Sequence, residues 1–317
     1  MSLKEASMKV FRNARVLALG AGSAIALALG GGVAAASPDS MEYVGYSPCT
    51  TPVKAVVPVT CDAETGLVHW RLQLHRNPSS HAPTTYDLWI EYGETANNAN
   101  GIARGLKTIK REGKWSMAGS GPRATVKLDG LLSFTHLGPG LIHPLNADGS
   151  LMTGNGGWSF TLSNAASLEK PADRSKAASM PEVSYQLTPL ASGPAVHGVF
   201  EGRTPCQGVS RELKIEAHPA CEKLKWRVTL YQEADKPTTY KAEGSLFKAR
   251  MREGRWSSSS GPLGVAYKLE GAGGAPPIQL LRGDDDVLFF LGQNGALLMG
   301  SADFSYTLNR RGAGPGG

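Results

Sequence analysis

The chain lacks the short motifs that mark the common hydrolases, zinc peptidases and nucleotide-binding proteins. It has no Gly-x-Ser-x-Gly elbow, no His-Glu-x-x-His pair, and no phosphate-binding glycine loop outside segment 1–36. Its seven histidines include none that recurs at equivalent positions of the two halves. Catalytic groups of a duplicated enzyme should recur or meet between the halves, so we predict a protein that is not an enzyme. A hydrolase site between the halves is the alternative.

The most apolar stretch of the chain lies near its beginning. A basic segment precedes an Ala/Leu/Gly run over 16–33, and three alanines follow at 34–36. This order is typical of an export signal cleaved after Ala36, with translation starting at Met1 or Met8. An uncleaved membrane anchor is the alternative, because an apolar run of about 20 residues can span a bilayer. We predict a periplasmic or secreted protein with no membrane span after cleavage.

The chain has little net charge once this segment is removed. Its 33 basic and 27 acidic residues give a formal charge of +6. Segment 1–36 holds four of the basic residues and one of the acidic ones, so 29 and 26 remain, a charge of +3. Binding to nucleic acid then has no support from composition, and we predict no nucleic-acid partner.

Cysteine is scarce, and all four cysteines follow the export segment. None lies near residue 36, so the chain lacks the lipid-attachment cysteine of a bacterial lipoprotein. An even, duplicated set in an oxidising compartment indicates disulfides, and duplication favours Cys49–Cys61 and Cys206–Cys221. Loops of that size would each stabilise the fold by roughly 3 kcal/mol. A soft-metal site with free thiolates is the alternative.

One series of motifs occurs twice, in the same order. Variable loops separate the matches, and an ordered series of this kind indicates duplication of one module. We predict a first copy at 43–162, a linker at 163–196, a second copy at 199–310 and a disordered tail at 311–317. The matching motifs are Tyr43-x-Gly45-x-x-Pro48-Cys49 with Phe200-x-Gly202-x-x-Pro205-Cys206, Trp70-Arg71 with Trp226-Arg227, Pro83-Thr84-Thr85-Tyr86 with Pro237-Thr238-Thr239-Tyr240, Arg111-Glu112-Gly113-Lys114-Trp115 with Arg252-Glu253-Gly254-Arg255-Trp256, and Trp158-Ser159-Phe160-Thr161-Leu162 with Phe304-Ser305-Tyr306-Thr307-Leu308.

Both copies are predicted to be all-β. Segments 68–74 and 225–231 alternate apolar and polar side chains, as half-buried strands do. Turn sequences recur at regular spacing, and no segment has a convincing amphipathic helical pattern. About six short strands in each copy predict a small antiparallel meander sheet or closed barrel.

Two repeated features allow both a functional and a structural interpretation. Glu112 and Glu253 are the only acids repeated in a distinctive setting, and they are either ligands or parts of a hairpin turn. We favour the turn, because turns prefer charge next to glycine. The tryptophans that follow, Trp115 and Trp256, are predicted to lie in the core rather than to stack on a ligand.

The opening motif and the alternating strands after it resemble the N-terminal domain family of the envelope protein NlpE. Its motif glycine and proline are Gly45 and Pro48 in the first copy, and Gly202 and Pro205 in the second. The family is associated with copper resistance and envelope-stress sensing. The resemblance implies two tandem, six-stranded, lipocalin-like barrels in an exported protein that senses stress or metal by binding.

The chain departs from the family pattern at two points. Family members commonly carry Cys-x-x-Cys after the proline, whereas here the windows are 49–52 and 206–209, each with one cysteine. The lipid anchor is also missing.

Copper is the cofactor that the resemblance implies, and the soft ligands available for it are few. The candidates are Cys49, Cys206, Met152 and Met299. The alternative for the methionines is ordinary packing in the core. The partner is expected to be an envelope protein. A small apolar ligand in a barrel mouth, or an inhibitor-like contact with another protein, is the second hypothesis.

Overall fold

The computed structural model describes residues 39–50, 53, 66–95, 101–138, 140–180, 188–246 and 251–312. All of these residues belong to one compact unit, Pro38–Gly317. The predicted export segment, residues 313–317 of the predicted tail, and Cys61 lie outside the described residues.

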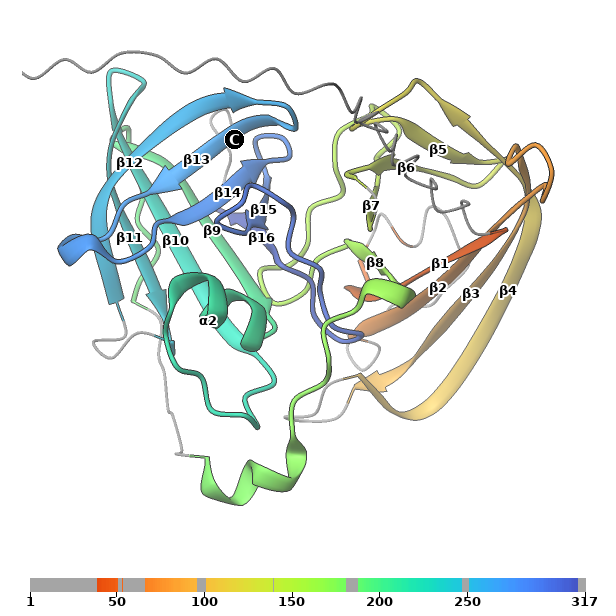
Figure 1. The fold of residues 1–317 in the computed structure, drawn as a ribbon, viewed down its shortest axis with the longest axis horizontal. Coiled ribbons are helices and arrows are strands. Elements are labelled where there is room, and N and C mark those ends of the chain that lie inside the picture. The colour runs from red at the N-terminus through yellow and green to blue at the C-terminus, as the bar shows by residue number, and fades with distance from the viewer. Residues whose placement is uncertain are drawn as a thin grey trace, which may run out of the picture. The chain divides into compact units, whose positions relative to one another are not determined.

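The first copy forms a closed antiparallel barrel in which consecutive strands pair (Figure 1). β1 also pairs with β8, through Tyr43 with Asn164 and Val44 with Ser163, and this pairing closes the ring. The strands are β1 Ser40–Pro48, β2 Leu67–Arg76, β3 Pro83–Thr95, β4 Ile102–Ala118, β5 Thr125–Leu128, β6 Leu132–His136, β7 Leu141–Pro144 and β8 Leu162–Asn164.

The second copy forms a second closed barrel with the same order of pairing. Its ring closes where β16 pairs with β9, for example Asn309 with Glu201. The 3-10 helices η1 Ala165–Ser167 and η2 Arg174–Ser179 lie between the two barrels in the sequence. The elements of the second barrel are β9 Val196–Thr204, α2 Gln207–Leu213, β10 Leu224–Glu233, β11 Lys236–Gly244, β12 Met251–Gly261, β13 Gly264–Leu269, η3 Ala272–Gly274, β14 Ile278–Arg282, β15 Val287–Leu291 and β16 Thr307–Arg311.

Each barrel has eight strands, so the prediction of about six was wrong. The missed strands are short, and β7 and β15 are buried at every residue. A strand that is buried on both faces does not alternate apolar and polar side chains, so the signal that we used is absent from it. The helix α2 was missed as well, because its seven residues are too few to show a helical period.

The repeated glycine of the opening motif lies where the barrel closes. A Cβ atom on Gly45 would lie 2.9 Å from the carbonyl oxygen of Thr161, and one on Gly202 would lie 2.4 Å from that of Thr307. A side chain at either position would therefore push away the segment that leads into the closing strand. The ring can close only because this position has no side chain.

Side chains fill the interior of each barrel. Trp70 and Trp226 occupy equivalent places, exposed by only 2% and 1%, and their indole N–H groups donate to Ser47 (2.7 Å) and Thr204 (2.8 Å). Other large buried side chains surround them. In the first barrel these include Tyr43, Leu72, Leu88, Trp115, Phe134 and Phe160, and in the second Phe200, Tyr240, Trp256, Phe290 and Leu308.

The two barrels contact each other through residues at equivalent positions. The hydroxyl oxygens of the paired threonines are 2.8 Å apart, and the stacked rings have centroids 4.8 Å apart. A residue that meets its own equivalent lies on the two-fold axis of an isologous contact, so the barrels are related as the subunits of a symmetric dimer are. The pairs are Thr161 with Thr307, Trp158 with Phe304, and His143 with Phe289, each 146 residues apart.

An apolar cluster drawn from both copies surrounds this axis. It explains why β7 and β15 are buried on both faces, because one face of each strand points into its own barrel and the other meets the partner barrel. The buried members are Leu137, Leu141, Leu151, Leu281, Val287, Phe289 and Leu291.

His143 is fully buried in this contact and is held as the neutral imidazole. Its Nε2 lies 2.8 Å from the carbonyl oxygen of Met152, which can only accept, so Nε2 carries the proton. Nδ1 then accepts from the hydroxyl of Thr161 at 3.0 Å, and the oxygen of Thr161 accepts from Thr307. Burial lowers the pKa of His143 to about 4 from its ordinary 6.5.

We predict that His143 makes the stability of the protein pH-dependent. The folded state keeps His143 neutral, whereas the unfolded chain binds a proton below about pH 6.5. The stabilisation is therefore complete above pH 6.5 and is lost as the pH falls towards 4. Between about pH 7.5 and 4.5 the difference in unfolding free energy between wild type and His143→Phe should shrink by about 2 to 3 kcal/mol.

Denaturant unfolding at a series of pH values measures this change. Phe289→Leu opens the same contact without altering a titrating group, so it is the control and should leave the pH dependence of wild type intact. Parallel curves for wild type and His143→Phe would show that His143 is not held neutral.

Candidate binding site beside the Cys206–Cys221 disulfide

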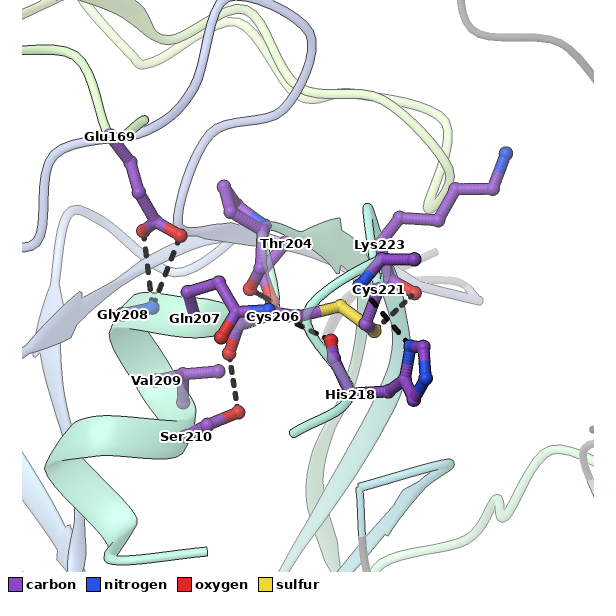
Figure 2. Close-up of a disulfide and its surroundings, with 12 residues drawn as sticks. Glu169, Thr204, Cys206, Gln207, Gly208, Val209, Ser210, His218, Cys221 and Lys223 are labelled. Carbon is purple, nitrogen blue, oxygen red and sulfur yellow. Dashed lines mark hydrogen bonds between the residues drawn. A yellow bond between two sulfur atoms is a disulfide. The ribbon is translucent and has the colours of Figure 1, made fainter. Parts of the chain in front are cut away.

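The second copy contains the disulfide predicted for it. Cys206 and Cys221 are bonded, with their Cα atoms 5.8 Å apart (Figure 2). Cys206 is buried where β9 leads into α2, and Cys221 lies shortly before β10. Cys49 is also disulfide-bonded, and its predicted partner Cys61 lies outside the described residues. The described cysteines therefore include no free thiol.

A glutamate from the segment after the first barrel accepts a hydrogen bond from the backbone at the start of α2. Both carboxylate oxygens of Glu169 lie 3.2 Å from the backbone N–H of Gly208, which donates to them (Figure 2). The hydroxyl of Tyr306 donates to Glu169 and accepts from the backbone N–H of Val209 at 3.3 Å. Burial, followed by the charge of Glu169, raises the pKa of Tyr306. The linker, the helix and the closing segment of the second barrel are thus joined at one point.

A pocket of about 320 Å³ lies against this junction. Its walls come from the linker, the Pro205–Gln207 turn, the disulfide and the turn around Asp303. Arg174 and Glu222 form an ion pair of 2.6 Å at its margin. Burial, followed by the charge of Glu222, raises the pKa of Asp303. A pocket of this size, with a mostly apolar surface and a few charged groups beside it, has the usual form of a small-ligand site.

Beside this junction, an aromatic stack crosses from one barrel to the other. The ring of Trp158 lies on that of Phe304, and Tyr46 lies next to Trp158 with centroids 6.0 Å apart. The guanidinium of Arg203 lies 5.7 Å from the centre of the Trp158 ring, and the ammonium of Lys223 lies 5.7 Å from that of Phe304. Cations over aromatic faces stabilise such a contact by about 0.5–1 kcal/mol each at exposed sites.

The four predicted metal ligands are not brought together. Met152 belongs to the core of the first barrel, and Cys49 packs against that core. Met299 packs into the cluster between the barrels, and Cys206 lies in the core of the second. In the part of the chain that the structure describes, no group of three or more His, Cys, Asp or Glu side chains is arranged to hold a metal ion.

Glu112 and Glu253 lie within strands, so the prediction of a hairpin turn was wrong. Both are exposed; Glu112 lies well inside β4, and Glu253 is the third residue of β12. The glycine that follows is needed for packing rather than for turning, because a Cβ on Gly113 would lie 3.0 Å from the ring of Tyr86. Trp115 lies in the core, with 3% of its surface exposed, and its indole donates to the carbonyl oxygen of His75 at 2.7 Å.

Sequence reasoning missed the polar residues that join the parts of the fold. Tyr306 and His143 stand where the other copy has Phe160 and Phe289. Comparing the two copies could have found them, because at each of these positions one copy has a polar side chain and the other has phenylalanine. Glu169 lies in a segment without periodicity, and no sequence signal singles it out.

Comparison of the chain with protein-family profiles, curated proteins and solved structures finds no match to any of them. Among the described helices, none is long and apolar enough to cross a membrane.

We predict that Tyr306→Phe weakens the junction at α2. The substitution leaves Glu169 and the N–H of Val209 without the Tyr306 hydroxyl, and a buried group that loses its partner costs about 1–3 kcal/mol. Urea unfolding measures the loss, and amide exchange should become faster at Gly208 and Val209. Tyr231→Phe in the same barrel is the control, because Tyr231 supplies a backbone carbonyl to Trp256, which the substitution keeps. Unchanged amide exchange in Tyr306→Phe would contradict the assigned junction.

Proposed function

We propose that the protein is an exported, non-catalytic, NlpE-like binding protein that takes part in envelope-stress sensing or metal resistance through a partner protein. The observation that carries the proposal is the filled interior of both barrels. Because aromatic and aliphatic side chains occupy the described interior, recognition is assigned to the outer surfaces and to the pocket beside α2. The Cys206–Cys221 disulfide supports an oxidising compartment.

Titratable side chains of the first barrel support binding rather than catalysis. His69 is paired with Glu91 at 3.0 Å, and His75 with Asp87 at 2.9 Å. Both pairs lie between adjacent strands, and among the described residues no serine, threonine or cysteine side chain is hydrogen-bonded to either histidine. A histidine acting as general base would need such a contact or an activated water.

A small ligand is the second candidate function, and one pocket favours it. About 560 Å³ of open space lies at one end of the first barrel, and its lining combines Leu131, Leu145 and Met152 with the polar Lys127 and Asn146. Native mass spectrometry of the purified protein would show a co-purified ligand if this pocket is the functional site.

The proposal predicts that host cells lacking the protein are more sensitive to copper or to envelope stress. Wild-type protein should restore growth, and Cys206→Ala with Cys221→Ala should restore it less well, because loss of that disulfide costs roughly 3 kcal/mol of stability. Growth of the deletion strain under graded copper and under detergent or alkaline stress is the measurement. Growth equal to that of the parent under every stress would overturn the proposal.

Copper titration separates sensing through a partner from direct metal binding. Oxidation that bridges all four cysteines leaves no thiolate, so we expect no stoichiometric uptake of copper(I) by the fully oxidised protein. Stoichiometric uptake that Met152→Leu or Met299→Leu abolishes would establish direct binding in place of the partner.

A further inference from the structure

Strand β4 pairs with β3 along one edge and with β5 along the other, and it extends far beyond the end of β5. It runs for 17 residues, Ile102–Ala118, whereas β12 in the second barrel has 11. β3 pairs with β4 along nearly its whole length, but β5 pairs only with Trp115–Ala118. Figure 1 shows β4 continuing well past β5. Among the described residues, no strand pairs with the second edge of β4 over 102–113.

The backbone of this edge is turned outward and exposed. The N–H of Asp129 donates to the carbonyl oxygen of Lys114 at 3.0 Å. The backbone N–H and C=O of Lys114 therefore point to the β5 side of β4. Direction alternates along a strand, and Thr108, Lys110 and Glu112 therefore point their N–H and C=O groups to the same side. Residues 103–108 are all exposed, and Leu106 is exposed by 59%. An exposed row of unpaired backbone groups is a template for another strand.

In the second copy, the segment between β13 and β14 contacts the start of the equivalent strand, β12. Arg252 donates to the carbonyl oxygen of Pro276 at 2.6 Å, and a Cβ on Gly271 would lie 2.1 Å from the same guanidinium. The segment between β13 and β14 supplies these contacts. In the first copy the connection from β5 to β6 is only 129–131, and the equivalent Arg111 donates to the carbonyl oxygen of its neighbour Lys110. The shorter connection leaves the edge of β4 open.

The open edge carries a strong excess of positive charge. Over 102–114 the one acid is Glu112, and the basic residues are Arg104, Lys107, Lys110, Arg111 and Lys114. The acids of the adjoining β3 are already engaged: Asp87 with His75 and Lys110, Glu91 with His69, and Glu94 with Arg104. Three of the basic residues, Lys107, Arg111 and Lys114, form no ion pair within the described part of the chain.

We propose that the edge of β4 over 102–113 binds an extended acidic segment of a partner protein as an added β-strand. Backbone hydrogen bonds supply affinity in this mode, and cross-strand charge pairs with Lys107 and Arg111, which lie on the same face of β4, supply selectivity. A second copy of the chain fits the edge poorly, because two such edges would place basic residues opposite basic residues. This inference rests on the proposed function, since it names the chemistry of the partner.

The test uses the oxidised protein and a synthetic peptide of about eight residues that alternates glutamate with threonine or valine. Fluorescence anisotropy should show binding, and the affinity should fall as salt is raised from about 0.05 M to 0.5 M. A peptide with lysine in place of glutamate should bind at least about tenfold more weakly, because like charges on neighbouring strands repel. A peptide N-methylated at alternate backbone nitrogens should also fail to bind.

Two matched variants locate the site. Glu112→Pro removes one outward N–H from β4 while leaving the hydrogen bonds to β3, and it should weaken peptide binding about tenfold or more. Glu253→Pro makes the equivalent change in β12 and should leave binding unchanged. Glu112→Ala keeps the N–H and should bind at least as well as wild type. Lys107→Glu with Arg111→Glu changes two charges on one face of β4 and should give a second loss of binding that does not depend on proline.

Several outcomes would overturn the inference. One is the absence of binding by the acidic peptide. Others are equal effects of Glu112→Pro and Glu253→Pro, or a dimer, detected by sedimentation, that Glu112→Pro abolishes.

Growth complementation keeps this test separate from that of the proposed function. Full complementation by Glu112→Pro together with no peptide binding removes the edge site alone. A deletion strain without phenotype, together with selective peptide binding, removes the stress function alone.

Discussion

The contact between the two barrels across their internal two-fold axis is the constraint on which the rest of the structure depends. Thr161 meets Thr307, and Trp158 meets Phe304, so each copy supplies the same surface. Neither barrel could leave β7 or β15 in water without exposing a strand that is now buried at every residue, and β15 is apolar throughout. Duplication therefore gave each barrel the partner that a symmetric homodimer would otherwise supply, within one chain.

The sequence predicted the features that each copy determines by itself. The repeat, the strand class and the Cys206–Cys221 pair follow from motifs that alternate or recur, and these motifs left a meander sheet or a closed barrel open for each copy. Features that depend on the other copy were not predicted. The strand β7 does not alternate because its outer face is covered, and Arg-Glu-Gly in β4 looks like a turn although Gly113 admits the ring of Tyr86. Contacts between distant segments leave no local pattern, so the junction of Glu169 with Tyr306 could not be foreseen.

Both proposed binding sites lie where the two copies differ. His143 replaces a phenylalanine in the contact between the barrels, and Tyr306 replaces one at the junction with α2. The connection between β13 and β14 contacts Arg252 at the start of β12, whereas its shorter counterpart makes no such contact with Arg111 of β4. Shared residues thus build the barrels, while the residues that differ provide a pocket in the second copy and an exposed basic edge in the first. A duplicated fold can keep its core and change its surface in this way, because the core residues are satisfied within each copy.

Calorimetry of the oxidised protein tests the central claim most directly. If the contact across the two-fold axis couples the barrels, they unfold together, with one transition whose calorimetric enthalpy equals its van't Hoff enthalpy. Two resolved transitions, each with the enthalpy of a single barrel, would show that the barrels are independent domains and would contradict the account.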